Sequence, residues 1–445
     1  MEVPAVDRTA WHQTLDAKQW RVLIAAFLGW IFNGYETYAL FLVMSPVLRQ
    51  LLEPEQLANL SSYAGMLVAA TLLGWATGGV LGGIVADYIG RKRTMIITIL
   101  IYASFVGLTS MAQSWTQLLA LRFLTGLGLG GEWVTGATLI AESWSPKARA
   151  KGAGMMQSAF GWGSFLAAGV WYFLEPAAGP AAWRWLFVLG ATPALFVPYI
   201  QWKVQESERW LEKHRQRGDL RHRRRSGVPL TAQETILTAF TVKALFSDPA
   251  LRRLVLLCLV MSLASTVGYW AVSTWIPAYT EAAAGAAGVE SPARWGAVAG
   301  LLYNAGAIWG YLAAGFLADW IGRRPLLVCF FAGSLVTTPV VYLWSHSPAA
   351  IVVAAAVNGV FTLGQFAWMA IYPPELFPTA LRATAVSIIF NTTRFLSFLG
   401  PLFAGLLITR LGGYGTTALL FSLTYLFAIC AVPFLPETKG KPLPE

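Results

Sequence analysis

Long apolar stretches alternate with short polar connections along almost the whole chain. The first stretch covers residues 21–44, and further stretches of similar length follow it. Each is about 20 residues long, which is the length of an α-helix that crosses the hydrocarbon core of a bilayer. The pattern predicts twelve membrane-spanning helices, at residues 21–44, 62–86, 94–113, 116–140, 152–174, 183–203, 254–279, 296–318, 325–344, 349–372, 383–408 and 414–435.

The connection between the sixth and seventh spans differs from the others because it is long, polar and basic. It runs from Val204 to Arg253 and contains Arg221 and the run from Arg223 to Arg225. Its later part, Pro229 to Phe246, has a helical periodicity typical of a segment that lies along a membrane surface. We expect an all-α integral membrane protein with an N-terminal six-helix bundle (1–203), a basic cytoplasmic linker (204–253) and a C-terminal six-helix bundle (254–445).

The composition supports this interpretation. Hydrophobic residues make up 56% of the chain and charged residues only 12%, whereas about a quarter of the residues of soluble domains are charged. So few charges cannot cover the surface of a soluble protein of 445 residues. The first apolar stretch, from Val22 to about Val43, is also too long for the core of a cleaved signal peptide.

The placement of Lys and Arg predicts how the helices cross the membrane. Cytoplasmic loops are enriched in these residues, and most of the 32 Lys and Arg residues lie in the connections on the side of the termini. Both termini are therefore expected to be cytoplasmic. The net charge of +10 reflects this topology, so we expect no nucleic-acid partner. The loops on the opposite side contain only Arg49, Arg184, Arg294 and Arg410.

No sequence pattern indicates an enzyme, a metal site or a bound cofactor. The three cysteines lie inside predicted spans, and no spacing typical of metal ligands occurs. Gly126, Gly128 and Gly131 match a dinucleotide-binding pattern, but no strand precedes them, so close helix packing explains them better. The chain has no Walker A sequence, which excludes ATP as the energy source.

An internal repeat relates the two halves of the chain. The pattern Gly83-x-x-x-Asp87-x-x-Gly90-Arg91 after the second span recurs as Gly315-x-x-x-Asp319-x-x-Gly322-Arg323 after the eighth. Two further motif pairs recur at offsets of 231 to 233 residues on the same predicted side. A parallel duplication of a six-helix unit explains all three pairs. The two further pairs are Glu142 and Arg149 with Glu375 and Arg382, and Glu206 with Glu437.

The repeated loop motif has a physical interpretation. Gly83 and Gly315 allow two helices to approach closely, and Gly90 and Gly322 permit a tight turn. Asp87 can pair with nearby arginines or cap a helix. We expect these charges to hold the two halves together in one state and to release them in another. The alternative is that they only set the membrane topology.

At these residues the chain resembles the major facilitator superfamily, over essentially its whole length. The paired loop motifs carry the resemblance, together with the fourth span from Arg122 to Glu132. Pro436 to Gly440 resembles the closing motif of sugar porters, whereas Gly130-Gly131-Glu132-Trp133 is similar to bacterial proton symporters of organic acids such as sialate and aromatic acids. Those symporters often have two acidic residues in the first span, where this chain has Asn33 and Glu36.

Four ionisable residues lie well inside predicted spans, where charges are costly and usually functional. They are Glu36, Arg122, Glu132 and Arg394. Arg394 shares a helix face with Ser387 and Asn391, and its planar guanidinium matches a carboxylate. We expect it to bind the carboxylate of a substrate, with a permanent ion pair to Glu36 or Glu132 as the alternative.

Glu36 and Glu132 are the candidates for the proton, because the four histidines lie outside the spans or at their ends. Glu36 shares a face with Asn33 and Thr37. Glu132 is either a proton carrier or a packing residue beside the glycine run. For Arg122 we favour a structural role near the outer end of its span, from which it can snorkel. Other polar residues expected to line a central cavity are Gln157, Tyr269, Asn304 and Gln365.

These observations predict a proton symporter that imports a small organic anion, with a carboxylate as the expected substrate, by alternating access. A sugar or polyol symporter is the first alternative, and a non-transporting nutrient sensor is another. The expected setting is a bacterial inner membrane, crossed many times by a functional monomer in contact with lipid.

Overall fold

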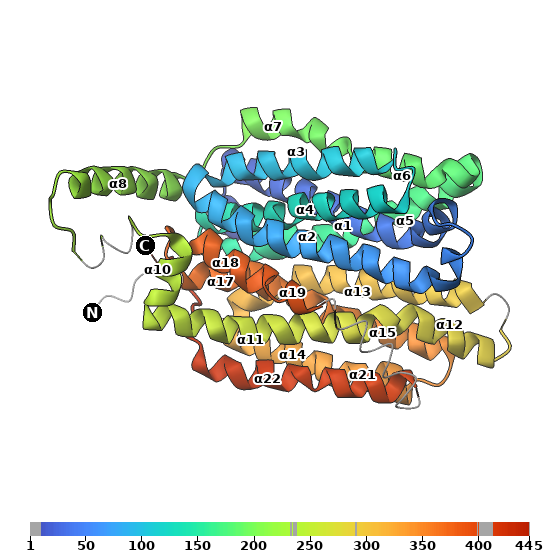
Figure 1. Cartoon of the computed structure of the whole chain (residues 1–445). Coiled ribbons are helices and arrows are strands. Elements are labelled where there is room, and N and C mark those ends of the chain that lie inside the picture. The colour runs from blue at the N-terminus through green and yellow to red at the C-terminus, as the bar shows by residue number, and fades with distance from the viewer. Residues whose placement is uncertain are drawn as a thin grey trace.

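The chain forms an all-helical molecule whose helices run side by side (Figure 1). The structure is a computed structural model, and it describes residues 10–231, 234, 238–289, 292–397, 399 and 413–444. Helices occupy all twelve predicted positions, although the later part of the eleventh, residues 398 and 400–408, lies outside the described residues. The prediction of a twelve-helix membrane fold is confirmed.

The first six spans form the N-terminal half. A short 3-10 helix, η1 (Trp11–Thr14), precedes them, and the sixth span is divided into α6, η4 and α7. The bounds are α1 (Ala17–Leu51), η2 (Gln56–Asn59), α2 (Leu60–Ile89), α3 (Arg91–Thr109), α4 (Trp115–Ser143), α5 (Arg149–Ala178), η3 (Gly179–Ala181), α6 (Ala182–Gly190), η4 (Thr192–Phe196) and α7 (Val197–Lys203).

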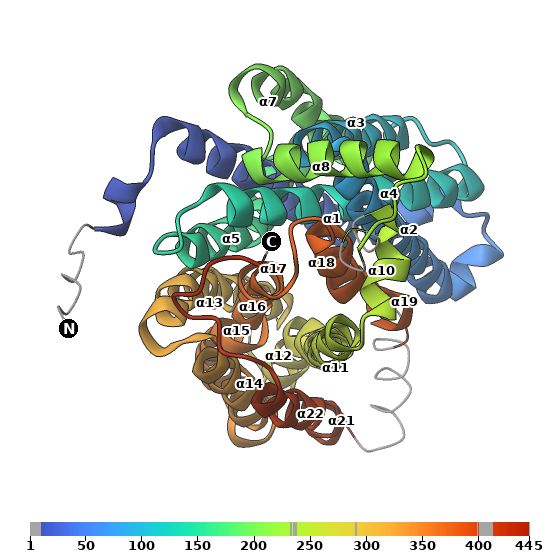
Figure 2. The same cartoon turned by 90° about the vertical axis from the view of Figure 1, so that its left-hand side faces the viewer.

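Two helices, α8 (Glu208–Arg225) and α10 (Thr241–Ser247), occupy the stretch predicted as a cytoplasmic linker. Both lie at one end of the bundles, where the described part of the chain also ends (Figures 1 and 2). The predicted surface segment, 229–246, lies partly outside the described residues. The domain boundaries around this linker stay predictions.

The last six spans form the C-terminal half, and several of them are interrupted. The seventh and tenth spans contain 3-10 turns, and the eleventh breaks after Asn391. The bounds are α11 (Pro249–Val272), η5 (Ser273–Trp275), α12 (Ile276–Ala286), α13 (Pro292–Ile321), α14 (Arg323–Pro339), η6 (Val340–Trp344), α15 (Pro348–Thr362), η7 (Gly364–Phe366), α16 (Ala367–Ile371), α17 (Pro373–Leu376), α18 (Arg382–Asn391), α19 (Arg394–Ser397), α21 (Tyr414–Ser422), α22 (Thr424–Ala431) and η8 (Val432–Phe434).

Eight of the spans are long and apolar enough to cross a membrane by composition alone, within the described residues. The first, fourth and fifth spans do not meet this criterion, and the eleventh is only partly among the described residues; Glu36 lies in the first span, and Arg122 and Glu132 lie in the fourth. Polar residues that weaken the membrane-spanning signal of a helix need a reason to be there.

Glycines bring the helices of each half into close contact. A Cβ at Gly78 in α2 would lie 1.9 Å from the carbonyl oxygen of Leu127 in α4, and one at Gly130 would lie 2.1 Å from that of Trp75. The C-terminal half repeats this arrangement, because a Cβ at Gly306 in α13 would lie 1.9 Å from the carbonyl oxygen of Ala356 in α15. The glycine run of the fourth span thus serves helix packing, as the sequence indicated.

The two halves lie side by side, with α2 against α18 and α5 against α13 (Figures 1 and 2). Both contacts depend on glycine. A Cβ at Gly83 would lie 2.1 Å from the Cβ of Ser387, and one at Gly315 would lie 2.6 Å from the carbonyl oxygen of Ala150. Gly83 and Gly315, the first glycines of the repeated loop motif, therefore allow helices of different halves to approach closely.

Candidate functional site

A buried ion pair joins the first and fourth spans inside the N-terminal half. Nη1 of Arg122 donates to Oε1 of Glu36, and its Nη2 donates to the hydroxyls of Thr109 and Thr125 at 2.6 and 3.1 Å. The Arg122 side chain is fully buried, so its guanidinium is held inside the bundle by the pair. The partner of Glu36 is thus Arg122, and not Arg394.

Arg394 is buried in α19 without an acidic partner among the described residues. Its Nη1 donates to the carbonyl oxygen of Phe390, one turn earlier. The guanidinium carbon lies 4.9 Å from the centre of the Trp75 ring and 3.8 Å from that of Phe390. Aromatic rings therefore flank a cationic group whose charge no carboxylate of the described chain balances.

Asn391 and Ser387 continue the face of Arg394 toward α2. Both amide atoms of Asn391 are buried without a hydrogen-bond partner in the described part of the chain. A Cβ at Gly79 would lie 2.2 Å from Cγ of Asn391, and Ser387 donates to the Gly79 carbonyl oxygen at 2.5 Å. Asn391 and Arg394 thus offer unused hydrogen-bonding groups at the boundary between the halves.

An aromatic cluster surrounds this position. Trp133 of α4 stacks on Phe390 of α18, with ring centres 3.6 Å apart. Trp30 of α1 lies 6.1 Å from Trp133 and 6.2 Å from Trp75. The indole N–H groups of Trp30 and Trp75 are buried without partners among the described residues. The cluster combines apolar ring faces with unused donors, which suits a flat polar molecule.

Glu132 is fully buried in α4, and neither of its carboxyl oxygens has a hydrogen-bond partner in the described structure. A Cβ on Gly29 of α1 would lie 2.1 Å from its Oε1, so the absence of a side chain at Gly29 leaves room for the carboxyl group. Asn33 donates its Nδ2 to the Leu129 carbonyl oxygen at 3.0 Å. Asn33 and Glu132 are therefore neighbours at the contact between α1 and α4.

Gln157 connects the two halves. Its Oε1 accepts from Nε1 of Trp133 at 2.5 Å, and its Nε2 donates to the Phe366 carbonyl oxygen at 3.3 Å. The ring of Tyr269 lies 5.7 Å from that of Phe366. Gln157 and Tyr269 are thus placed where the predicted cavity residues of the two halves meet.

The other predicted cavity residues have local partners. Asn304 donates to the Gly300 carbonyl oxygen at 2.9 Å, within its own helix. Nε2 of Gln365 donates to the Thr362 carbonyl oxygen at 2.8 Å, and its Oε1 accepts from Ser265 at 3.4 Å. Neither residue contacts Arg394 within the described part of the chain, and their role in binding stays a prediction.

The repeated motifs converge on equivalent ion pairs at one end of each half. Arg91 binds Glu142 through Nε at 3.1 Å and Nη2 at 2.9 Å. Arg323 binds Glu375 in the same way, at 2.9 and 2.8 Å. Asp87 and Asp319 lie 3.1 Å from their arginines. Motifs that lie about 50 residues apart in sequence thus meet at one site in each half.

Glu206 and Glu437 bind the beginnings of α3 and α14, a role that the sequence analysis missed. Glu206 accepts from the backbone N–H of Arg91 at 3.0 Å, and Glu437 accepts from that of Arg323 at 2.9 Å. The preceding glycines, Gly90 and Gly322, have φ of 105° and 97°, which favours glycine. The offset of 231 between the two glutamates was visible, but their helix partners were not.

The two glutamates differ in their protonation behaviour. Burial raises the pKa of Glu206 more than its hydrogen bonds, led by that from the Ser207 backbone N–H, lower it. Burial also acts to raise the pKa of Glu437, but backbone N–H groups, led by those of Arg323 and Arg324, outweigh this effect and hold the pKa below its ordinary value. Equivalent positions of the repeat therefore respond differently to acid.

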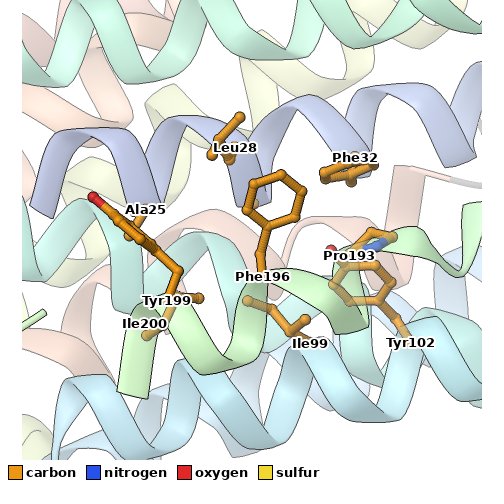
Figure 3. A pocket seen from close by; sticks show the side chains of 10 residues that line it. Ala25, Leu28, Phe32, Ile99, Tyr102, Pro193, Phe196, Tyr199 and Ile200 are labelled. Carbon is orange, nitrogen blue, oxygen red and sulfur yellow. The ribbon is translucent and has the colours of Figure 1, made fainter. Parts of the chain in front are cut away.

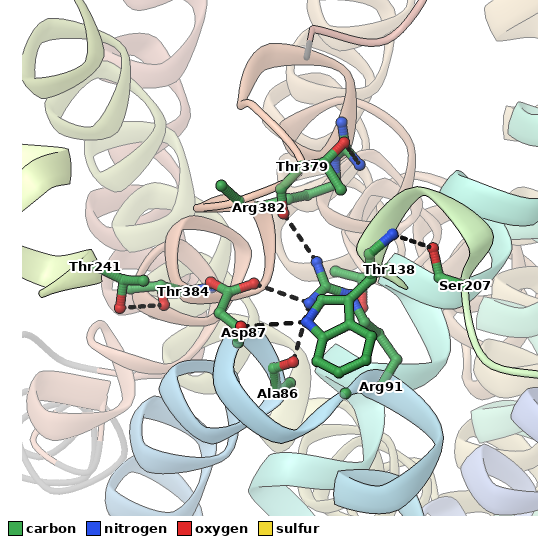
Figure 4. A network of polar contacts seen from close by, with 12 residues as sticks. Ala86, Asp87, Arg91, Thr138, Ser207, Thr241, Thr379, Arg382 and Thr384 are labelled. Carbon is green, nitrogen blue, oxygen red and sulfur yellow. Dashed lines mark hydrogen bonds and ion pairs between the residues drawn. The ribbon is translucent and has the colours of Figure 1, made fainter. Parts of the chain in front are cut away.

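Contacts between the halves close this end of the molecule (Figure 4). Arg382 of α18 donates to Oε1 of Glu142 at 2.9 Å, and Asp87 accepts from the backbone N–H of Thr384 at 2.9 Å. Lys151 pairs with Asp319 across the halves. The remaining cross pair, Arg149 with Glu375, is longer at 3.9 Å.

Helix α8 lies outside the two bundles and contacts both of them at the closed end. Arg217 donates through Nη1 to the Asp87 carbonyl oxygen at 2.9 Å and through Nη2 to the Ala380 carbonyl oxygen at 2.7 Å. One side chain thus touches both halves. The sequence analysis missed this contact, because the basic run of the linker gives no signal that singles out Arg217.

Comparison with known proteins gives a consistent result. The profile of the family described as "Sugar (and other) transporter" matches residues 21–445. A protein of Haemophilus influenzae described only as a metabolite transport protein is 31% identical over 95% of this chain and 98% of its own length. A niacin transporter of Acinetobacter baylyi is 28% identical over 94% of this chain and 93% of its own length. A cis,cis-muconate transport protein of the same organism is 28% identical over 87% of each chain.

Solved structures share the fold. The proton:xylose symporter XylE bound to 6-bromo-6-deoxy-D-glucose superposes with a TM-score of 0.75 at 20% identity, over 96% of this chain and 98% of that chain. The human organic anion transporter MFSD10 gives a TM-score of 0.68 at 15% identity, over 94% of this chain and 100% of that chain. At these identities the likeness concerns the architecture alone.

Proposed function

We propose, from the premise that this chain belongs to the sugar (and other) transporter family of the major facilitator superfamily, that it carries a small organic anion across the membrane together with protons. Family membership makes the protein a multi-pass membrane transporter of a small molecule, and not an enzyme. The anion and the proton are our proposal.

Arg394, which has no acidic partner among the described residues, carries the proposal. A buried cation without a partner is costly, so such residues usually face a partner or a substrate pathway. Guanidinium and carboxylate match as two parallel hydrogen bonds. Nη1 of Arg394 already donates to the Phe390 carbonyl oxygen of α18, and the other nitrogens of the guanidinium are left for a carboxylate. Asn391 has an unused amide on the same face. A carboxylate bound at Arg394 would balance the charge, and the rings of Trp75 and Phe390 suit a flat substrate.

Glu36 and Arg122 supply the proposed proton site. A proton on Glu36 would neutralise the carboxylate and free Arg122, which adds one positive charge to the buried core. An anion at Arg394 adds one negative charge. Either change alone is costly in a low-dielectric interior, whereas the two together leave the buried charge unchanged. The anion and the proton therefore favour each other, which couples their movement.

This coupling differs from the expectation that an anion would displace Glu36 from Arg394. The two residues are not paired, so direct competition for Arg394 does not operate in this state. The proposed coupling acts through the electrostatic balance of the core, and it needs no contact between the anion and Glu36.

The proposed direction is uptake across a bacterial inner membrane with both termini in the cytoplasm. The placement of Lys and Arg supports the orientation, and several relatives are bacterial. The closed end with Glu142 and Arg382 is then the cytoplasmic gate, and the substrate would enter from outside and be released when this gate opens.

The relatives support an acid as cargo. Their names include transporters of niacin, cis,cis-muconate and sialic acid, all of which carry carboxyl groups. A sugar is the competing substrate, and the segment Pro436 to Gly440 favours it. A neutral sugar, however, gives no reason for a buried arginine without a carboxylate partner.

Reconstitution in liposomes tests the proposal. A pH gradient, acidic outside, should drive uptake of at least one of nicotinate, cis,cis-muconate and N-acetylneuraminate, and Arg394→Ala should abolish it. Arg184→Ala is the matched control and should keep uptake, because Arg184 lies in α6 at the end of the bundle away from the closed end (Figure 1). Gradient-driven uptake of xylose with none of the three acids would overturn the proposal.

A further inference from the structure

One buried carboxyl group has no part in the function proposed above. Glu132 is fully buried, and its two oxygens have no hydrogen-bond partner among the described residues. An unpaired carboxylate in a dry interior is so costly that such a group is held in its neutral form instead. In the closed state seen here, Glu132 therefore holds a proton.

The neighbour of Glu132 fits the protonated form. The side-chain amide of Asn33 adjoins the carboxyl group. Its Nδ2 is used by the Leu129 carbonyl oxygen, and its Oδ1 has no partner in the described structure. A carboxylate can only accept hydrogen bonds, whereas a protonated carboxyl group carries an O–H donor. A protonated Glu132 can donate to the unused acceptor of Asn33, whereas the carboxylate can only accept from its amide N–H group.

Tyr102 of α3 interacts electrostatically with both Glu132 and Glu36. It packs on Gly128, where a Cβ would lie 2.6 Å from its own Cβ. The ring points from α3 toward α1 (Figure 3), and its hydroxyl is buried without a partner among the described residues. A phenol both donates and accepts a hydrogen bond. The Tyr102 hydroxyl forms a hydrogen bond with neither carboxyl group in this state, so it can connect them only when its side chain moves.

A small cavity lies beside this tyrosine (Figure 3). The centre of a water-sized sphere can occupy a volume of about 10 Å³ inside it. Its lining residues include Gly29, Phe32, Tyr102 and Phe196. A single water molecule needs about this volume. Gly29 also contacts Glu132, so the cavity reaches the surroundings of both Tyr102 and Glu132.

The carboxyl groups of Glu36 and Glu132 lie at different depths along the bundle. Gly29, which contacts Glu132, precedes Glu36 by seven residues in α1, which corresponds to a rise of about 10 Å along a helix. Because α1 begins near the closed end, Glu132 lies nearer to that end than the pair of Glu36 and Arg122. A proton that moves from Glu36 to Glu132 thus moves toward the proposed cytoplasmic gate.

We propose that Glu132 is a second proton-binding carboxyl group, that it receives its proton from Glu36 through the hydroxyl of Tyr102, and that each anion is carried with two protons. This inference rests on the proposed function. In the transfer, the Tyr102 oxygen accepts a proton from Glu36 and gives its own hydroxyl proton to Glu132, so the tyrosine ends unchanged. A monoanion with two protons moves one net positive charge.

Infrared spectroscopy of the purified protein tests the protonation without any substrate. The wild-type protein at neutral pH should show the C=O band of a buried protonated carboxylic acid, with a shift in heavy water. Glu132→Gln should remove this band, and Glu36→Gln should keep it. A band that survives in Glu132→Gln, or that is absent from the wild-type protein, would overturn the inference.

Transport of the nicotinate monoanion tests the stoichiometry. An inside-negative potassium diffusion potential, with equal pH on both sides, should increase wild-type uptake severalfold. Glu132→Gln should lose this stimulation, because one proton and one anion carry no net charge, yet keep uptake driven by a pH gradient. Unchanged stimulation in Glu132→Gln contradicts the inference. Wild-type transport that is independent of protons would instead contradict the proposed function.

Two further variants separate a proton path from packing. Tyr102→Phe keeps the ring and should slow gradient-driven uptake severalfold while leaving nicotinate exchange at equal pH intact. Tyr425→Phe, which removes a hydroxyl buried in the other half, is the matched control and should keep both rates. Gly29→Ala should reproduce the loss of potential dependence, because its methyl group would displace the Glu132 carboxyl group. Equal behaviour of Tyr102→Phe and Tyr425→Phe would reject the path through Tyr102.

Discussion

Oε1 of Glu142 accepts a hydrogen bond from Nη1 of Arg382 at 2.9 Å, although the two residues are 240 positions apart and belong to different halves. The same oxygen accepts from Nη2 of Arg91 at 2.9 Å. The carboxylate of Glu142 therefore connects the repeated motif of its own half with the other half. This relationship makes Glu142 the central residue of the closed gate.

Glu142→Gln should weaken the gate. Removing one partner of a buried ion pair costs about 3–5 kcal/mol. The substitution destabilises the closed state, because only in that state does Arg382 contact Glu142 of the N-terminal half. We expect a lower melting temperature and faster labelling of a cysteine introduced at Ser387, on the inner face of the gate. Glu375→Gln is the matched control, because its contact across the halves with Arg149 is longer, at 3.9 Å. Equal labelling rates for the two variants would contradict this account.

Gly83→Ala should disfavour the same closed state by a steric route. The added Cβ would lie 2.1 Å from that of Ser387 and 2.6 Å from the Ala383 carbonyl oxygen, so α2 and α18 would have to separate. We expect transport to fall at least tenfold, measured as initial uptake in liposomes. Gly65→Ala serves as the control in the same helix, because no atom lies within 4 Å of its Cβ position. Normal uptake by Gly83→Ala would show that the close contact is dispensable.

Glu36→Gln should abolish accumulation driven by a pH gradient and spare exchange of labelled for unlabelled anion. The substitution removes the group that takes up the proton and leaves Arg122 without its carboxylate. The two activities are measured on the same liposomes, with and without the gradient. Accumulation by Glu36→Gln at the wild-type level would exclude Glu36 from proton coupling.

Glu206→Gln and Glu437→Gln should change stability with opposite pH dependence. The pKa of Glu437 is lowered in the folded protein, so its carboxylate stabilises the fold above the pKa of the unfolded chain, and this contribution disappears as the pH falls. The pKa of Glu206 is raised, so its contribution is present at low pH and is lost as the pH rises through the folded-state value.

The melting temperature between pH 4 and pH 7.5 measures this difference. Glu437→Gln should melt below the wild-type protein at neutral pH, with the gap closing toward pH 4. Glu206→Gln should gain on the wild-type protein as the pH rises from 4. The same trend in both variants would contradict the assigned directions.

The fold and the gate could be predicted from the sequence because their signals are local or repeated. The length of each apolar stretch defines a span, and the recurrence of Asp87 with Arg91 as Asp319 with Arg323 indicates equivalent loops. Neither step needs the register between distant helices. The ion pairs of Arg91 with Glu142 and of Arg323 with Glu375 do need it, and they were not predicted.

The partner of Glu36 could not be predicted, because it depends on the register in which α1 packs against α4. Glu36 and Arg122 are 86 positions apart in the sequence. Two arginines and two glutamates inside spans allow several pairings of equal charge. Nor could the rings around Arg394 be selected in advance, since 20 tryptophans occur in the chain and nothing local distinguishes Trp75. These choices are made by packing between helices.

The role of Arg394 is tested most directly by the binding of carboxylates to the purified protein. The melting temperature is measured with nicotinate, cis,cis-muconate, N-acetylneuraminate and xylose, for the wild-type protein, Arg394→Ala and Arg184→Ala. The account predicts that at least one carboxylate raises the melting temperature of the wild-type protein and of Arg184→Ala, and that Arg394→Ala loses this effect. Stabilisation by a carboxylate that survives in Arg394→Ala, or stabilisation by xylose alone, would contradict it.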